Sequence, residues 1–444
     1  MASIASTARP RRTSRTATRS AKRPVEYSIL FTATLCLLAT GAVMVYSASS
    51  AEAVLGGSGE ASFYLKRYVM FGLVGMAALH FLARGGLGLV HRLTPLALGA
   101  GFVLTLAVMV PGVGVTVNGA TRWLGAGPLQ FQPSELLKLA LVLYAVRLLA
   151  ERPESVRTLK GLARPLLLVV GVACALLMKQ PDMGTALVIC FSMGALLIAA
   201  GTPIRHLGVM AAVLAGLALV LAVIEPYRME RLTAFLDPFS DAGDTGFQAV
   251  QALTAIGSGG LFGVGLGESV QKIFYLPEAH TDMILAIIGE ELGLAGILGV
   301  AALYGMIGYA GLRAAKAARD RYSKLLAAGI TSLILSQATL NFFAVLGMAP
   351  LTGVPLPFIS YGSTNLIVLL AGMGLLLNVA ATGGRQAKAA PTTRAHEALE
   401  ALADSLPPRL RAIDGGRSDQ GRDRGGRDGR ARGAGTGRRG RASG

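Results

Sequence analysis

The sequence predicts an all-α polytopic membrane protein with about ten transmembrane helices. Of its 444 residues, 52% are hydrophobic and 15% are charged, whereas an average soluble domain carries about 25% charged residues. Apolar runs recur along the whole membrane region. Basic residues collect in the two tails and in alternate gaps between the runs, which is the pattern that sets membrane topology. The net charge of +17 therefore indicates topology and contact with anionic lipid, and we expect no nucleic-acid partner.

The apolar runs define ten expected spans. A span needs roughly 20 residues, and several apolar cores are shorter, so their polar ends must lie in the headgroup region or against other helices. The expected cores are 29–46, 68–82, 93–111, 136–149, 165–178, 185–200, 207–224, 283–312, 325–348 and 366–381.

The basic segments between some of the apolar runs indicate how the chain is oriented in the membrane. They follow the second, fourth, sixth and eighth spans, and the positive-inside rule places them in the cytoplasm together with both termini. We expect residues 1–26 to form a disordered basic tail, 27–385 to form the membrane domain, and 386–444 to form a disordered Arg/Gly-rich tail. These tails are too polar to bury a core, and we expect them to contact anionic lipid.

The longest outer segment is the loop 225–282, between the seventh and eighth spans. Four of its apolar residues recur at helical spacing, which predicts an amphipathic helix: Phe247, Val250, Leu253 and Ile256. This helix either lies at the outer membrane interface or packs on the bundle as a cap. Closely spaced glycines in 258–267 favour close backbone packing or a mobile loop.

The stretch YLPEAHTDMILAIIGEELG, residues 275–293, passes from a polar loop into the eighth apolar run. Ionisable groups at such a boundary are costly and usually have a purpose. Asp282 or Thr281 is suited to cap the following helix. A carboxylate at the edge of an apolar cavity can also act as a general base. The two roles are compatible, and residue chemistry alone does not choose between them.

Basic residues on the outer face stand out because the positive-inside rule depletes cations there: Lys66, Arg67, Arg122, Lys179, Arg228, Arg231 and Lys272. A functional role is favoured for Arg122, Lys179, Arg228 and Arg231. As a set they are suited to bind a diphosphate through charge-assisted hydrogen bonds. The alternative is ordinary snorkelling of long side chains to lipid headgroups.

Four further charged residues lie inside expected spans. Glu135 and Lys138 are three positions apart and can pair on one helix. Glu290 and Glu291 lie in the eighth span, and for one of them we expect a basic or amide partner, with Lys138 as a candidate. Structural bracing is the favoured role for all four, and an ion or proton pathway is the alternative.

Five segments together resemble the SEDS family (shape, elongation, division and sporulation proteins). They occur in the family's order across the membrane region, and the tails fall outside the resemblance. The segments are NGATRWLGAGPLQFQPSELLKLALVLY (118–144), KQPDMGTALV (179–188), FLDPFSDAGDTGFQAVQALTAIGSGGLFGVGLGES (235–269), YLPEAHTDMILAIIGEELG (275–293) and GVPLPFISYG (353–362).

Within the family, FYLPEAHTD and RWLGAGPLQFQPSEL look more like the division branch (FtsW-like) than the elongation branch (RodA-like). In one place the chain departs from the family pattern. The family typically has SYGG followed by small residues, whereas Gly362 is followed here by Ser363, Thr364 and Asn365.

The resemblance implies a peptidoglycan glycosyltransferase that polymerises lipid II into glycan strands for the division septum. It implies that Asp282 is the catalytic aspartate, acting as general base, with Glu278, His280 and Thr281 shaping the site around it. A divalent cation, Mg²⁺ or Mn²⁺, is left open as a cofactor, and the histidines show no metal-ligand spacing.

The implied partners are lipid II, a class B penicillin-binding transpeptidase and other divisome proteins, at the septal inner membrane of a bacterium. Three alternatives remain at this point: an elongation-type polymerase, a flippase that carries lipid II across the membrane, and a scaffold that recruits the transpeptidase. A flippase would depend more on charges in mid-membrane, such as Lys138, Glu290 and Glu291.

Overall fold

The computed structural model describes residues 24–55, 59–117, 119–126, 129–224, 229, 233–244 and 246–383, and the side chains of these except 126, 129 and 218–224. Most of the first predicted tail and all of the second lie outside this part of the chain.

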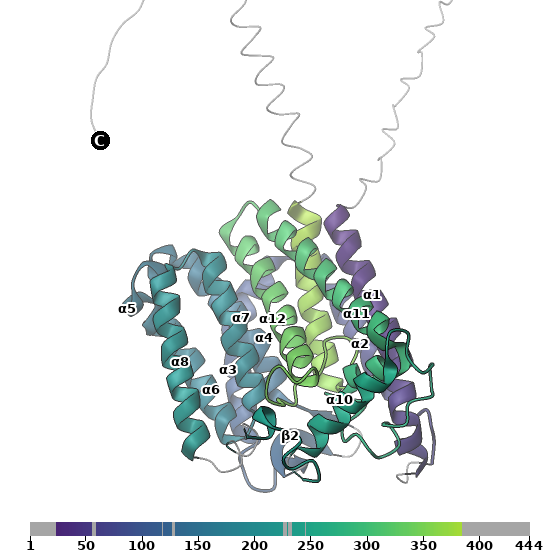
Figure 1. The fold of residues 1–444 in the computed structure, drawn as a ribbon. Coiled ribbons are helices and arrows are strands. Elements are labelled where there is room, and N and C mark those ends of the chain that lie inside the picture. Colours follow the sequence, from purple (N-terminus) through teal and green to yellow (C-terminus); the bar gives the residue numbers. More distant parts are fainter. Residues whose placement is uncertain are drawn as a thin grey trace, which may run out of the picture. The chain divides into compact units, whose positions relative to one another are not determined.

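The described chain is a bundle of long helices (Figure 1), which confirms the predicted all-α membrane class. Eight helices of this part are long and apolar enough to cross a membrane. The long helices are α1 (Val25–Leu55), α2 (Phe63–Arg84), α3 (Leu87–Ala107), α4 (Pro133–Glu151), α6 (Leu168–Lys179), α7 (Met183–Ala200), α8 (Ile204–Ile224), α11 (Ile284–Ala317), α12 (Arg321–Val345) and a final helix, Ser363–Gly383.

The eight include Leu159–Lys179, which runs through the short helix α5 (Leu159–Leu162) and a π-helical turn, Ala163–Leu167, into α6. A 3-10 turn, Pro153–Arg157, precedes α5. Helices α4 and α8 coincide with the two other expected spans, and the total of ten stays a prediction.

Local sequence signals explain where several helices start and stop. Asp182 caps α7 by accepting a hydrogen bond from the Thr185 backbone N–H at 3.3 Å, and Asp320 caps α12 through Ser323 at 2.8 Å. Both follow the preference for short polar side chains at this position. Gly201 ends α7 in the left-handed conformation that glycine tolerates best.

A small sheet lies where the sequence predicted only a loop. Strands β1 (Gly114–Val117), β2 (Ala120–Ala126) and β3 (Leu129–Phe131) form an antiparallel sheet in the order β1-β2-β3. The strands are short, and glycines lie in and between them, so no clear alternation of apolar and polar residues marks them in the sequence. The sheet presents Arg122, on β2, at the same end of the bundle as α10 (Phe247–Gly259) (Figure 1).

Helix α11 is broken at Gly293, whose φ of 67° and ψ of −165° are not helical. The glycine-rich stretch fills the break. The N–H groups of Val264 and Gly265 donate to the carbonyls of Glu290 and Glu291 at 2.9 and 3.1 Å. In return, Leu294 N donates to Gly260 O and Ala295 N donates to Leu261 O. This exchange satisfies backbone groups that the break would leave unpaired, and it confirms close packing of the glycines.

The amphipathic helix predicted around Phe247–Ile256 exists as α10, and it packs against α11. Its most buried residues are the small ones, Ala252, Ala255 and Gly259, while the four apolar residues that predicted the helix are only partly buried. A Cβ atom at Gly259 would lie 1.9 Å from the carbonyl oxygen of Gly289. The contact between α10 and α11 therefore depends on the absence of side chains.

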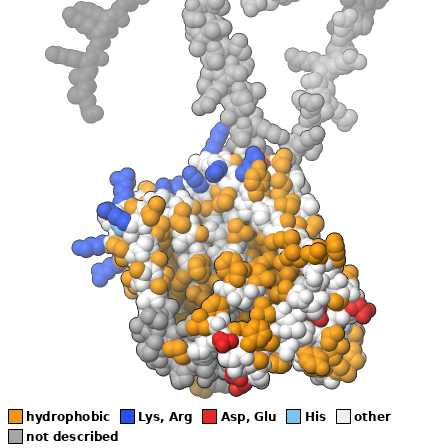
Figure 2. All heavy atoms as spheres, viewed as in Figure 1, with side chains coloured by type: hydrophobic (Ala, Val, Ile, Leu, Met, Phe, Trp, Pro, Cys, Tyr) orange, Lys and Arg blue, Asp and Glu red, His pale blue; other side chains and the backbone are white. Residues whose placement is uncertain are grey.

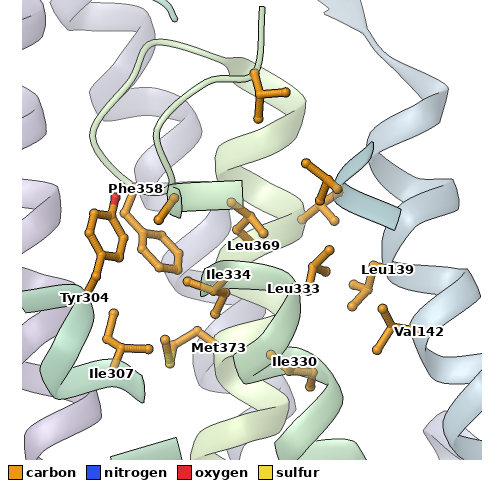
Figure 3. Close-up of a cluster of buried hydrophobic side chains, with 14 of the residues drawn as sticks. Leu139, Val142, Tyr304, Ile307, Ile330, Leu333, Ile334, Phe358, Leu369 and Met373 are labelled. Carbon is orange, nitrogen blue, oxygen red and sulfur yellow. The ribbon is translucent and has the colours of Figure 1, made fainter. Parts of the chain in front are cut away.

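A central part of the core lies between α4, α11, α12, the final helix and the segment 350–362 that precedes it. Figure 3 shows side chains from these elements pointing toward one another, including Val142, Ile334, Phe358 and Met373. Phe358 is 1% exposed, although it lies in a segment without regular secondary structure. This segment therefore enters the bundle instead of running over its surface.

Candidate functional site

Asp282 lies in a turn directly before α11. The helix begins at Ile284, and Met283 occupies the N-cap position without a side-chain capping bond. This differs from the expectation that Asp282 or Thr281 is the capping residue. The Asp282 side chain is partly buried. The Thr281 hydroxyl donates to Glu278 Oε2 at 2.6 Å and also lies 3.3 Å from Asp282 Oδ1, so it connects the two carboxylates.

Two parts of the fold hold this turn in place. On α12, the amide of Asn341 donates to the backbone carbonyl of Asp282 at 2.7 Å. In the segment 350–362, the N–H of Tyr361 donates to the carbonyl of His280 at 3.0 Å. The same segment passes in front of the carboxylate at Gly353, where a Cβ atom would lie 3.8 Å from Asp282 Oδ2.

The predicted site residue His280 is buried in an aromatic cluster. Its Nδ1 atom lies 3.1 Å from Glu52 Oε2, near the C-terminal end of α1. Its ring centroid lies 4.4 Å from that of Tyr64 on α2 and 5.6 Å from that of Tyr361. No local sequence pattern points to Glu52, Tyr64 or Asn341, because their contacts with this turn join residues that are far apart in the chain.

The segment 350–362 takes its hydrogen bonds from side chains. Gln337 Nε2 donates to Pro355 O and Asn341 Nδ2 donates to Val354 O, both at 2.8 Å. The hydroxyls of Tyr304 and Tyr68 donate to the carbonyls of Pro357 and Phe358. Buried backbone carbonyls need such partners when no helix or sheet supplies them. The segment 350–362, which lies beside Asp282 and is called the Gly353 wall below, is therefore held by side chains of several helices.

The four predicted diphosphate ligands are only partly located. Arg122 Nε donates to Gln180 O at 3.0 Å, and its Nη2 donates to Pro181 O. Lys179 is exposed and lines a groove of about 420 Å³ between β1–β2 and the end of α6. Arg228 and Arg231 lie outside the described residues. The structure therefore brings Arg122 beside the loop that follows Lys179, with part of its guanidinium bound to backbone.

The buried charges form two separate groups. Lys138 Nζ lies 2.9 Å from Glu135 Oε1 and donates to Gln337 Oε1 at 2.9 Å. Lys272, from the long loop, pairs with Glu291 at 2.9 Å, and the Ser47 hydroxyl donates to the same carboxylate.

The suggestion that Lys138 pairs with Glu290 or Glu291 was wrong. Glu290 accepts hydrogen bonds from the Ser269 hydroxyl and the Val270 N–H. The partners of both glutamates come instead from the long loop and from α1, because the break in α11 lets the glycine-rich stretch lie directly beside them.

Within the described residues, no group of three or more His, Cys, Asp or Glu side chains is arranged to hold a metal ion. Hard divalent cations take several oxygen ligands. We therefore assign no metal ligands among the described residues.

Comparison with known proteins places the chain in a family. A family model described as "Cell cycle protein" matches residues 27–384. The chain is 41% identical over 349 residues to the probable peptidoglycan glycosyltransferase FtsW of Geobacter sp. (strain M18), covering 76% of this chain and 92% of that relative. It is 37% identical to the stage V sporulation protein E of Bacillus subtilis, covering 79% and 96%.

Two solved structures share the fold. One carries the description "Structural coordination of polymerization and crosslinking by a peptidoglycan synthase complex". It matches with TM-score 0.67 and 30% identity, covering 80% of this chain and 97% of that one. The other is the rod shape determining protein RodA of Thermus thermophilus, with TM-score 0.57, 30% identity and coverage of 79% and 95%.

Fold and site thus define a multi-pass membrane protein of the cell cycle protein family. The chain belongs to this family, which is the SEDS family that its motifs indicated, and it is of the division type, FtsW-like.

Proposed function

We propose that this chain is a peptidoglycan glycosyltransferase that polymerises lipid II at the outer face of the cytoplasmic membrane, with Asp282 as general base. A sugar hydroxyl of one substrate attacks the anomeric carbon of the other. Asp282 accepts the hydroxyl proton as the new C–O bond forms. The bond from the anomeric carbon to the diphosphate oxygen breaks, and the lipid diphosphate leaves with the electron pair.

The observation that carries the proposal is the surroundings of Asp282. Its carboxylate is partly buried in a turn that Asn341 and Tyr361 hold from two sides. Gly353 lies beside it, where an added Cβ atom would be 3.8 Å from Asp282 Oδ2, so this residue adds no side-chain atom next to the carboxylate. A carboxylate positioned in this way suits a base that must approach a hydroxyl within about 3 Å.

The charge distribution supports the expected orientation. On the face shown in Figure 2, Lys and Arg side chains gather at the end of the bundle near α5, and Asp and Glu side chains are seen at the opposite end, near α10. The positive-inside rule assigns the basic end to the cytoplasm. Asp282, directly before α11 at the α10 end, then faces the side where the cell wall is built. There the polyprenyl chain of the substrate can stay in the bilayer.

We assign binding of the departing diphosphate to Arg122 and Lys179, together with Arg228 and Arg231 of the long loop. Fixed cations stabilise charge that develops on a leaving group. Glu278, His280 and Thr281 shape the site: His280 anchors the turn to α1, and Thr281 links the carboxylates of Glu278 and Asp282.

We also propose which protein the chain works with and where it acts. A solved structure with the same fold is a peptidoglycan synthase complex, which supports a class B penicillin-binding transpeptidase as partner and the division septum as the place of action. We keep Glu135, Lys138, Glu290 and Glu291 as structural charges, since each has a partner within the bundle. This favours a polymerase over a flippase that relies on charges in mid-membrane.

The test is a polymerisation assay with purified protein, its transpeptidase partner and labelled lipid II. Glycan strands should appear on a gel with the wild-type chain and vanish with Asp282→Asn. The matched control is Glu268→Gln, which neutralises an exposed carboxylate of the same loop and should leave polymerisation intact. Polymer formation by Asp282→Asn at the wild-type rate would contradict the assignment. Transfer of lipid II across liposomes without any polymer would favour the flippase.

A further inference from the structure

Asn341 connects the turn that carries Asp282 to the wall that faces it. The residue lies near the end of α12 and is 2% exposed. Its Nδ2 group donates to Asp282 O at 2.7 Å and to Val354 O at 2.8 Å. Both N–H donors of the amide are therefore used, one on the turn that carries Asp282 and one on the segment that contains Gly353.

The two acceptors belong to segments that lack regular secondary structure. Asp282 lies in the turn before α11, and Val354 follows Gly353, the residue that faces the carboxylate. Neither backbone is fixed by a helical or sheet ladder at this point. The Tyr361 N–H to His280 O bond joins the two segments at one point, and the Asn341 amide, which binds a carbonyl of each, sets their separation at Asp282 and Val354.

The same helix provides an internal comparison. Gln337 lies four residues before Asn341, so both side chains project from the same face of α12. The Gln337 amide donates to Pro355 O, the carbonyl next to Val354, and it also contacts Lys138 and Asn365. Gln337 thus holds the same segment with the same chemical group, and the contacts of its amide lie away from Asp282.

A further detail fits a role for the donor group in particular. The Oδ1 atom of Asn341 is buried without a hydrogen-bond partner among the described residues. A buried amide that leaves one acceptor unpaired is unfavourable for stability. An apolar side chain at position 341 would avoid this cost. We therefore attribute the polar residue at this position to the hydrogen bonds that its two N–H groups donate.

We propose that Asn341 is a positioning residue for glycosyl transfer: by binding both carbonyls, it fixes the Asp282 carboxylate relative to the Gly353 wall. This inference rests on the proposed function of Asp282. Asn341 takes no part in proton transfer. Its loss lets the base move away from the line of approach to the acceptor hydroxyl.

The experiment compares Asn341→Leu with Asn378→Leu in the lipid II assay with the partner transpeptidase. Each substitution replaces a buried amide whose Nδ2 group donates to two backbone carbonyls, and those of Asn378 are Leu82 O and Gly85 O, which are not part of the site. A misplacement of about 1 Å can reduce the rate about 100-fold, so we expect Asn341→Leu to reduce kcat by roughly 10- to 100-fold, with KM for lipid II changed less than about threefold. Asn378→Leu should lower the thermal unfolding temperature at least as much, with kcat within about threefold of wild type.

Two results overturn the proposal. The first is a wild-type kcat for Asn341→Leu. The second is a fall in kcat that follows the loss of thermal stability equally in both variants, which is the signature of a purely structural residue. If Asn341→Leu does not fold, Asn341→Ser is measured in its place, because the smaller side chain leaves room for water at the two carbonyls. The same predictions apply to it.

Asp282→Asn is run in parallel to separate this proposal from the proposed function. If Asp282→Asn is inactive and Asn341→Leu is fully active, the base assignment stands and the positioning role fails. If Asp282→Asn polymerises like wild type, the base assignment fails, and the positioning role fails with it.

Discussion

At the scale of the residue, the contact between Gly353 and Asp282 is specific enough to test. Gly353 has a φ of 68°, and a Cβ there would lie 3.8 Å from Asp282 Oδ2. We expect Gly353→Ala to cost about 1–2 kcal/mol in stability because a side chain disfavours this φ. It should also reduce polymerisation about tenfold or more, because the methyl group intrudes on the space where the acceptor must bind.

Gly347→Ala is the control for that prediction. Gly347 has a φ of 70°, and its added Cβ would contact Leu253 at 3.4 Å, in α10. It therefore carries the same backbone strain in the same connection after α12, without the contact to Asp282. Initial rates with lipid II and thermal unfolding are measured for both variants. Equal losses of activity would show that strain alone, and not the space before Asp282, is responsible.

At the scale of the element, the long loop is tied to the bundle by a buried ion pair. Lys272 and Glu291 have side chains 7% and 0% exposed, and Ser47 of α1 shares the carboxylate. Removing one member of a buried pair leaves an uncompensated charge and typically costs about 3–5 kcal/mol. We expect Lys272→Met to lower the unfolding temperature in detergent strongly, and Lys272→Met/Glu291→Leu to recover much of the loss. Equal instability of the double variant would contradict this account.

The packing of α10 on α11 gives a second element-scale prediction. A Cβ at Gly259 would lie 1.9 Å from Gly289 O, whereas one at Gly257 of the same helix meets nothing within 4 Å. Overpacking typically costs about 1–3 kcal/mol, and a clash with backbone belongs at the upper end of that range, so Gly259→Ala should be clearly destabilised. Gly257→Ala should be neutral or stabilised by roughly 0.5–1 kcal/mol. Thermal unfolding of the two variants decides, and equal stability would refute the close approach.

At the scale of the whole molecule, the proposed orientation can be tested by labelling. In a variant without the three native cysteines, Glu60→Cys should react with a membrane-impermeant maleimide in intact spheroplasts. Arg319→Cys should react only after the membrane is opened. Glu60 precedes α2 and Arg319 lies between α11 and α12, and both are exposed in the structure. The reverse labelling pattern would overturn the orientation and place Asp282 in the cytoplasm.

The sequence by itself determined the membrane class, the apolar helices, the division-type family and the position of Asp282 at the edge of a span. The family follows from the resemblance of its motifs. The other features follow from local patterns, because apolar runs and the sidedness of charge can be recognised over short stretches of chain. The same local reasoning missed the short strands β1–β3. It also suggested Lys138 as a partner for the glutamates of α11.

Only the tertiary structure decided which groups meet. Ser47 and Glu291 are 244 positions apart, and Asn341 and Asp282 are 59 apart. A pattern of burial says that a polar group needs a partner, but it does not say which distant residue supplies it. Asp282 could therefore be singled out from the sequence as a candidate base. The two hydrogen bonds of Asn341, the position of Gly353 beside Asp282 and the contact between His280 and Glu52 depend on how the helices pack around the broken α11, so only the tertiary structure shows them.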